Sequence, residues 1–167
     1  KIDTITIHCM AGNLSVETCG QLFYRPSRQA SSNYGIGTDG RIGLYVEESN
    51  RAWTSANPAN DHRAITIEVA NDGGAPEWHV SDKAMESLIN LCADICRRND
   101  IKELVFSDNK DDRINHRNGA NMTWHRDFAN TACPAPYLMS KHPYIAAEVN
   151  KILNPPTALK GVCQMPN

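Results

Sequence analysis

The sequence predicts an α/β domain in which a central mixed β-sheet is flanked by helices. Two stretches, residues 4–7 and 65–68, alternate isoleucine with polar residues, as β-strands with two unlike faces do. Residues 81–98 instead repeat apolar side chains at helical spacing. A hairpin signal lies between the two strands. Because strands alternate with helices and one hairpin interrupts them, we expect the sheet to be mixed.

The chain is expected to begin with a strand and then a helix. His8 falls at the C-terminal end of this first strand, which alternates threonine and isoleucine. Ser15 is a suitable N-cap for the helix, which should stop before Pro26. Leu22 and Phe23 fit its buried stripe.

A hairpin and a second strand follow. The dipeptide Asp39-Gly40 is typical of a tight hairpin turn. The second strand, in the stretch "AITIEVAND" that Asn71-Asp72-Gly73-Gly74 closes, places Glu68 on the face opposite its two isoleucines. The apolar positions of the hairpin are Ile36, Ile42, Leu44 and Val46.

The clearest helix follows, over residues 81–98, with Ser81 as its cap. Residues 103–108 are short and apolar, which indicates a strand or a buried turn. Residues 109–122 are polar and are expected to form a loop.

A last helix is expected from about residue 141 to 153, with Pro143 tolerated in its first turn. Pro155 would end it. We therefore expect one domain, residues 1–154, followed by a Pro-rich tail or linker, residues 155–167.

Composition excludes several classes of protein. The 167 residues carry a formal net charge of -2 and contain no basic run, so a nucleic-acid-binding stripe is not expected. No apolar stretch approaches the roughly 20 residues that span a bilayer, so we expect no membrane insertion. The first residues read as a strand rather than a signal peptide, so export by a phage-type route and removal of a leader both stay open. We expect a monomer.

The six cysteines are too sparse for a disulfide scaffold in a chain of this length. Cys92 and Cys96 lie four residues apart on the predicted helix and therefore share a face. We interpret them as small apolar residues of the core.

Three residues are candidate metal ligands: His8, His125 and Cys133. Imidazole and thiolate are ligands that zinc prefers, and a catalytic zinc uses three protein ligands and keeps a fourth position for water. Asp127 is placed to orient the His125 ring through a hydrogen bond. Spacing alone is a weak signal, because a histidine at a strand end or a lone cysteine is more often structural.

The sequence stretches around these residues make the prediction of a zinc site specific. The stretches "TITIHCM", "SSNYGIGTDGRIGLYVEESNRAWTSA", "AITIEVAND" and "TWHRDFANTACP" follow one another in this order. Over Ile2 to about Leu138, the chain resembles the zinc-dependent N-acetylmuramoyl-L-alanine amidases of type 2. That family includes phage endolysins, bacterial autolysins and animal peptidoglycan recognition proteins.

The resemblance implies a groove over the sheet that holds the glycan and stem peptide of peptidoglycan. It implies one Zn²⁺ per chain, bound by His8, His125 and Cys133, and hydrolysis of the amide between N-acetylmuramic acid and L-alanine in the cell wall. Glu68 falls on the family's general acid/base. Thr131 falls where members carry a Lys or Thr that hydrogen-bonds the reacting oxygen.

The chain also departs from the family pattern. Asn33 and Thr54 stand where histidine is frequent, and Tyr34 does not match the family's catalytic tyrosine. Further candidates for substrate contacts are Asn33, Trp53, Asn57 and Arg63. The remaining histidines are expected at the surface: His62, His79, His116 and His142.

Three alternatives stay open at this level. One is a peptidoglycan-binding module without catalysis, although non-catalytic family members typically lack the cysteine ligand. A second is a cysteine hydrolase that pairs Cys133 with His125, which leaves His8 and Glu68 without a role. A third is a structural zinc site, which requires a fourth protein ligand that the sequence does not offer.

Overall fold

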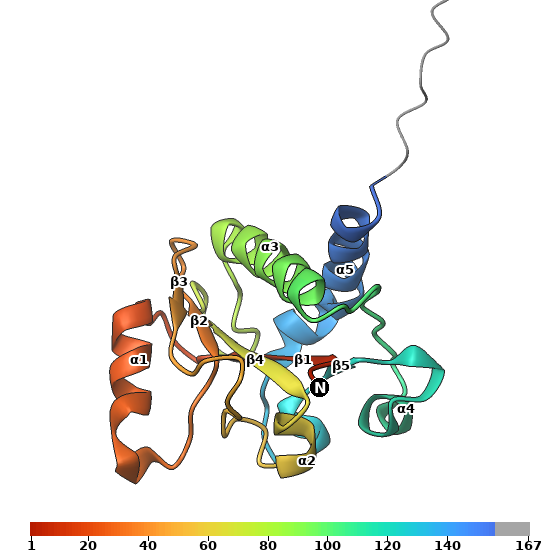
Figure 1. Cartoon of the computed structure of the whole chain (residues 1–167). Coiled ribbons are helices and arrows are strands. Elements are labelled where there is room, and N and C mark those ends of the chain that lie inside the picture. The colour runs from red at the N-terminus through yellow and green to blue at the C-terminus, as the bar shows by residue number, and fades with distance from the viewer. Residues whose placement is uncertain (156–167) are drawn as a thin grey trace, which may run out of the picture.

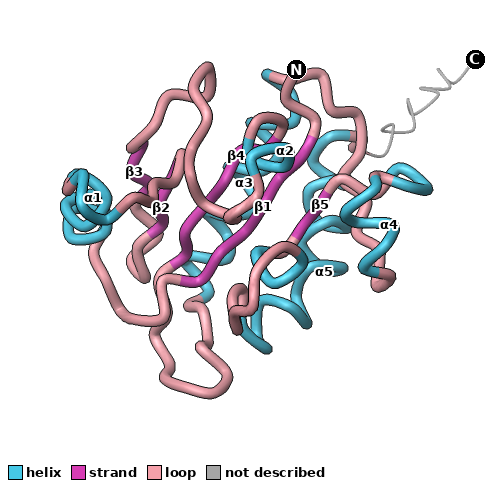
Figure 2. The backbone as a smooth tube through the Cα atoms, turned by 90° about the horizontal axis from the view of Figure 1, so that it is seen from below, coloured by secondary structure: helices cyan, strands magenta, loops and turns pink. Residues whose placement is uncertain are grey.

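The computed structural model describes residues 1–155 and contains a five-stranded mixed sheet with the strand order β3-β2-β4-β1-β5 (Figure 1). Figure 2, seen from below, shows these strands side by side. The sheet confirms the predicted fold class. Its strands are β1 (Thr4–Cys9), β2 (Tyr34–Ile36), β3 (Ile42–Leu44), β4 (Ala64–Val69) and β5 (Met122–Thr123).

The central strand β1 pairs in parallel with β4 on one side and with β5 on the other. Strand β2 is parallel to β4, and β3 returns antiparallel to β2 as the predicted hairpin. The register places His8 directly opposite Glu68. These two residues therefore lie on the same face of neighbouring strands.

Helices cover both faces of the sheet. In Figure 1, α3 and α5 lie above the sheet and α2 lies below it. Ser15, Asn57 and Ser81 each accept a hydrogen bond from the first turn of the helix that they cap. The helices are α1 (Val16–Tyr24), α2 (Pro58–Asp61), α3 (Asp82–Arg98), α4 (Lys110–Asn115) and α5 (Ala135–Leu153).

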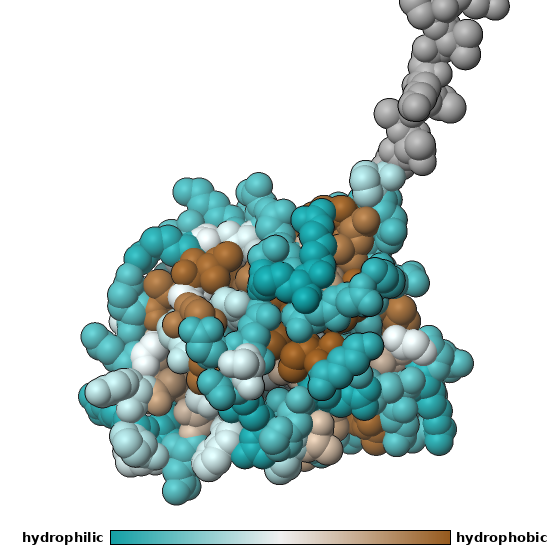
Figure 3. Space-filling model, viewed as in Figure 1, coloured by the Kyte–Doolittle hydropathy of each residue, from teal (hydrophilic) through white to brown (hydrophobic). Residues whose placement is uncertain are grey.

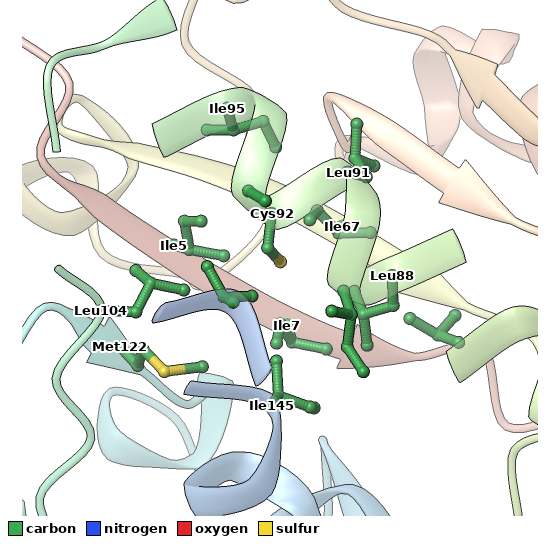
Figure 4. Close-up of a cluster of buried hydrophobic side chains, with 14 of the residues drawn as sticks. Ile5, Ile7, Ile67, Leu88, Leu91, Cys92, Ile95, Leu104, Met122 and Ile145 are labelled. Carbon is green, nitrogen blue, oxygen red and sulfur yellow. The ribbon is translucent and has the colours of Figure 1, made fainter. Parts of the chain in front are cut away.

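The hydrophobic core lies between the sheet and the pair α3 and α5 (Figure 4). Alternation along β1 and β4 sends their isoleucines into this layer, where they are fully buried. Cys92 and Cys96 are buried in the same layer as free thiols, as the helical spacing indicates. The labelled core residues of Figure 4 are Ile5, Ile7, Ile67, Leu88, Leu91, Cys92, Ile95, Leu104, Met122 and Ile145.

The opposite face of the sheet is buried but polar. Thr6 and Thr123 share a hydrogen bond of 2.7 Å, and Asn60 of α2 bonds to both of them at 3.1 and 3.0 Å. Each of these three side chains thus has a partner, which avoids the cost of burying it alone. The network fixes β1, β5 and α2 relative to one another. It therefore also fixes the starting points of the segments that follow these strands.

Two predicted helices differ from the structure. Leu22 of α1 is 42% exposed, and the buried residues of this helix are Val16 and Cys19, because α1 packs against β2 and β3 at one side of the sheet rather than over its centre. Helix α5 begins six residues earlier than predicted, at Ala135, and Pro143 lies in its interior. Burial of Leu138 against the core stabilises the added turns.

The polar stretches contain elements that the sequence did not predict, namely α2, α4 and β5. Each is too short to show a period. Residues 103–108 form neither helix nor strand, although Leu104 is buried. The expected tail falls almost entirely on residues 156–167, which lie outside the described residues.

The surface in Figure 3 is hydrophilic over most of the face shown, with separate apolar patches. Ile42 and Leu44, expected as apolar positions of the hairpin, are about half exposed on the edge strand β3, at 44% and 49%. Among the described residues, no helix combines the length and apolar character that crossing a bilayer requires.

Replacing Gly35 of β2 by alanine should destabilise the fold by about 1–3 kcal/mol, because the new methyl group would lie 2.2 Å from Tyr45 Oη. Gly74→Ala is the control, since a Cβ there meets no atom within 4 Å. Denaturant unfolding of both variants measures the difference. Equal free energies of unfolding would contradict this account of β2.

Candidate metal centre

The structure brings three of the candidate residues together. One ligand atom from each of His8, His125 and Cys133 lies within 4.8 Å of the others. His8 ends β1, His125 opens the short turn after β5, and Cys133 precedes α5. Because β5 pairs in parallel with β1, residues more than a hundred positions apart meet at the C-terminal ends of these two strands.

The histidine rings are held in a neutral form by burial. His8 is 1% exposed, and its Nδ1 lies 3.4 Å from Cys133 Sγ. Its Nε2 has no hydrogen-bond partner within residues 1–155. Burial lowers the pKa of His8 to about 3 and also lowers the pKa of His125. Neutral imidazole is the form that coordinates a metal ion.

The thiol of Cys133 completes the set. A hydrogen bond with Cys9, together with burial, raises its pKa. This does not favour a free nucleophilic thiolate, whereas a bound cation would deprotonate the sulfur outright. Among the described residues, no fourth His, Cys, Asp or Glu joins the cluster. Two imidazoles and one sulfur fit a zinc ion with an open position.

A cavity of about 320 Å³ opens onto this cluster. Its wall combines ligating, acidic and aromatic side chains. A second cavity, of about 400 Å³, adjoins it and shares Trp53, Thr54 and His125. Together they provide room for an extended substrate. The wall of the first cavity includes His8, Cys9, Phe23, Arg28, Trp53, Glu68, Trp78, His125, Thr131 and Cys133.

Glu68 lies in the first cavity beside His8. Burial raises the pKa of its carboxyl to about 8, with Cys9 acting in the same direction and Arg28 opposing them. Strand β4 lies inside the sheet, between β2 and β1. Glu68 is therefore not a solvated residue on an edge strand, and its carboxyl can hold a proton near neutral pH.

Thr131 also lines the first cavity, and its Oγ accepts a hydrogen bond of 3.2 Å from the backbone N–H of Cys133. Asp127 occupies a different position from the expected one. It is buried and pairs with Arg113 rather than with the ring of His125.

The four substrate candidates separate into two groups. Trp53 is 56% exposed and lines both cavities, and Asn57 lines the second cavity while it caps α2. Asn33 is instead fully buried and hydrogen-bonds to the backbone of Thr66, so it holds β2 and β4 together. Arg63 lines neither cavity and forms two hydrogen bonds with Asp3. The positions of Asn33 and Arg63 do not support a substrate contact.

Sequence reasoning missed several residues around the site. Trp78, in a loop, and Arg28, in the 3-10 helix Pro26–Arg28, line the first cavity from segments that carry no motif, so only the tertiary structure places them there. His142 was expected at the surface but is fully buried, with its ring against Phe106 and Trp124. It lies near the predicted start of α5, on the face of the helix that packs against these aromatic rings.

Comparison with solved structures shows a shared fold. The chain resembles the amidase LysC from Clostridium intestinale URNW, with 17% identity over 89% of this chain and 85% of that one and a TM-score of 0.63. A mutant endolysin from Bacillus subtilis gives 15% identity, coverage of 89% and 86%, and a TM-score of 0.64. An endolysin from a Thermus scotoductus bacteriophage is 15% identical over 90% of this chain and 86% of that one, with a TM-score of 0.56.

A comparison with curated proteins finds no match. The model of one family, described as N-acetylmuramoyl-L-alanine amidase, matches residues 1–136, which contain every member of the metal cluster and Glu68. The chain belongs to this family, the N-acetylmuramoyl-L-alanine amidases, which hydrolyse the amide bond between N-acetylmuramic acid and L-alanine in peptidoglycan.

Proposed function

We propose that this amidase acts on the bacterial cell wall as a monomer with one zinc ion bound by His8, His125 and Cys133. The observation that carries this proposal is the cluster of three ligand atoms within 4.8 Å, in one cavity with Glu68. Zinc bound there would polarise the scissile carbonyl and make a water molecule acidic enough to react near neutral pH. The other steps fall to the chain's own residues.

Glu68 is the general base and then the general acid. It takes a proton from the attacking water and delivers one to the nitrogen of the leaving L-alanine. The raised pKa of its carboxyl, about 8, supports this role, because a group that titrates near the working pH can both accept and donate.

Thr131 donates a hydrogen bond to the oxyanion of the tetrahedral state. Its oxygen already accepts from the N–H of Cys133, which leaves the hydroxyl hydrogen free to donate. The same bond fixes the hydroxyl beside the cluster. A donor that is held in place costs little reorganisation during the reaction.

Trp53 and Asn57 contact the substrate along the adjoining cavity. The exposed indole of Trp53 offers a flat apolar surface for a sugar ring or a stem peptide. A cysteine hydrolase is the weaker account, since it requires a lowered pKa at Cys133, whereas the hydrogen bond with Cys9 and burial raise it.

Each of His8→Ala, His125→Ala and Cys133→Ser should remove bound zinc and abolish hydrolysis of purified peptidoglycan, because two ligands hold the ion too weakly. Metal analysis and release of new L-alanine N-termini measure the two effects. His62→Ala, at an exposed histidine, is the control and should keep both. Full activity in Cys133→Ser would rule out this ligand set.

Glu68→Gln should keep zinc and lower turnover by about 10²- to 10⁴-fold, since an amide cannot exchange the proton. Parallel metal and activity assays separate this loss from a loss of metal. Wild-type turnover in this variant would remove Glu68 from the mechanism.

The same variant tests the raised pKa through stability in the presence of a chelator. Native Glu68 keeps its proton up to about pH 8, whereas the unfolded carboxyl ionises near its ordinary value of 4.5. Wild-type stability relative to Glu68→Gln should therefore fall as pH rises from 4.5 to 8, by about 5 kcal/mol at most. Urea titrations at several pH values measure this, and parallel curves would argue against it.

Trp53→Ala should raise the apparent KM for peptidoglycan about 3- to 10-fold with little change in kcat, because it removes a binding surface and not a reacting group. Tyr24→Ala is the matched control, since Tyr24 is an exposed aromatic residue that lines neither cavity. The assignment fails if both substitutions shift KM equally.

A further inference from the structure

A buried ion pair lies directly behind the turn that carries His125. The carboxylate of Asp127 accepts hydrogen bonds from Arg113 Nε at 2.9 Å and from Arg113 Nη2 at 2.7 Å. A third bond, of 2.9 Å, comes from the backbone N–H of Trp124. The two charged side chains are 4% and 1% exposed. This bidentate pair is therefore almost fully removed from water.

We propose that Arg113 and Asp127 are positioning residues for the zinc site, because they fix the turn that presents His125 and, through that turn, the segment of Cys133. This inference rests on the proposed zinc chemistry and adds to it the part of the fold that sets the geometry of two of the three ligands. Neither residue belongs to the cluster itself.

The turn around His125 is short and is closed at both ends by Asp127. The side chain of Asp127 binds the N–H of Trp124, and its own N–H donates to the Trp124 carbonyl at 3.0 Å. The carbonyl of His125 accepts from the N–H groups of Phe128 and Ala129 at 3.0 and 3.1 Å. The backbone before and after His125 is thus held by reciprocal bonds.

The same turn also holds the Cys133 segment. The backbone N–H of Arg126, the residue between His125 and Asp127, donates to the Cys133 carbonyl at 3.1 Å. A displacement of the turn would therefore move both ligands relative to His8. His8 is set independently, because β1 is paired on both sides within the sheet.

Arg113 anchors this arrangement to α4. Its Nη1 donates to the carbonyls of Ser107 and Asp108 at 2.7 and 3.0 Å, and its guanidinium lies 4.0 Å from the centre of the Trp124 ring. These contacts fix the orientation of the planar guanidinium that binds Asp127. Helix α4 and the loop before it thereby become the support of the His125 turn.

Stability alone is a weak reason for such a pair. Desolvation of two charges offsets much of their attraction, and apolar replacement of a buried ion pair is often neutral or stabilising. What the pair supplies is direction, since a bidentate contact fixes both the distance and the plane of the partners. Directional support behind a ligand is what a metal site needs for tight binding.

The test compares Asp127→Asn and Arg113→Lys with wild type in the full chain. Both variants keep polar side chains of similar size but lose the bidentate charge pair. We expect zinc affinity, measured by competition with a chelator, to fall about 10- to 100-fold. We also expect the absorption spectrum of the Co²⁺-substituted protein to change, because that spectrum reports ligand geometry and not stability.

Asp3→Asn is the matched control. Asp3 forms a bidentate pair with Arg63 at 2.7 and 2.6 Å, beside the start of β1 and far along that strand from His8. This variant should keep wild-type zinc affinity and a wild-type cobalt spectrum. The thermal midpoint of each metal-free variant separates loss of folding from loss of positioning.

The possible results are distinct. A lower midpoint with unchanged zinc affinity and cobalt spectrum in both Asp127→Asn and Arg113→Lys would overturn the inference and make the pair purely structural. If one variant fails to fold, the other decides. If the wild-type chain itself binds no zinc, the proposed function fails and the inference fails with it. If the wild type binds zinc and both variants match its zinc affinity and cobalt spectrum, only the inference fails.

Discussion

The alternation of side chains along β1 and β4 is the constraint on which the rest of the molecule depends. Ile5 and Ile7 enter the core beneath α3 and α5, so His8 must face the other side of the sheet. The parallel register then sets Glu68 beside it. A slip of one residue would exchange the two faces and place both polar side chains in the core. Burial of the isoleucines thus fixes the site.

The polar side of the sheet supports the site through satisfied hydrogen bonds. Thr6, Thr123 and Asn60 form a closed network where an apolar layer would otherwise be expected. Such networks are directional, so they hold β5 at one height beside β1. The turn that starts at His125 follows β5, so this network and the ion pair between Asp127 and Arg113 together set its position.

Burial has opposite consequences for the acidic and basic groups of the site, and both suit a metal hydrolase. It lowers the pKa of His8, which keeps a nitrogen lone pair available, and it raises the pKa of Glu68, which keeps a proton within reach near neutral pH. In the proposed mechanism, one desolvated cavity thus prepares a metal ligand and a proton carrier at the same time. Aromatic side chains at its wall, Trp53 and Trp78, extend it toward a larger substrate.

The sequence by itself determined the elements whose signal is local. The alternation of β1 and β4, the turn at Asp39-Gly40 and the period of α3 each lie within a few residues, and side-chain packing only confirmed them. The candidate ligands came from motifs rather than spacing, because 117 positions separate His8 from His125 and chain distance of that size carries no geometric information.

Only the tertiary structure decided the features that depend on distant partners. Strand β5 exists because β1 supplies its hydrogen bonds, and Asp127 faces Arg113 rather than His125 because α4 brings a guanidinium behind the turn. Asn33 and Arg63 form hydrogen bonds with Thr66 and Asp3, partners that the local sequence does not indicate. The physical reason is common to all of them: a polar side chain takes whichever partner the fold places within hydrogen-bond distance, and local sequence does not encode that partner.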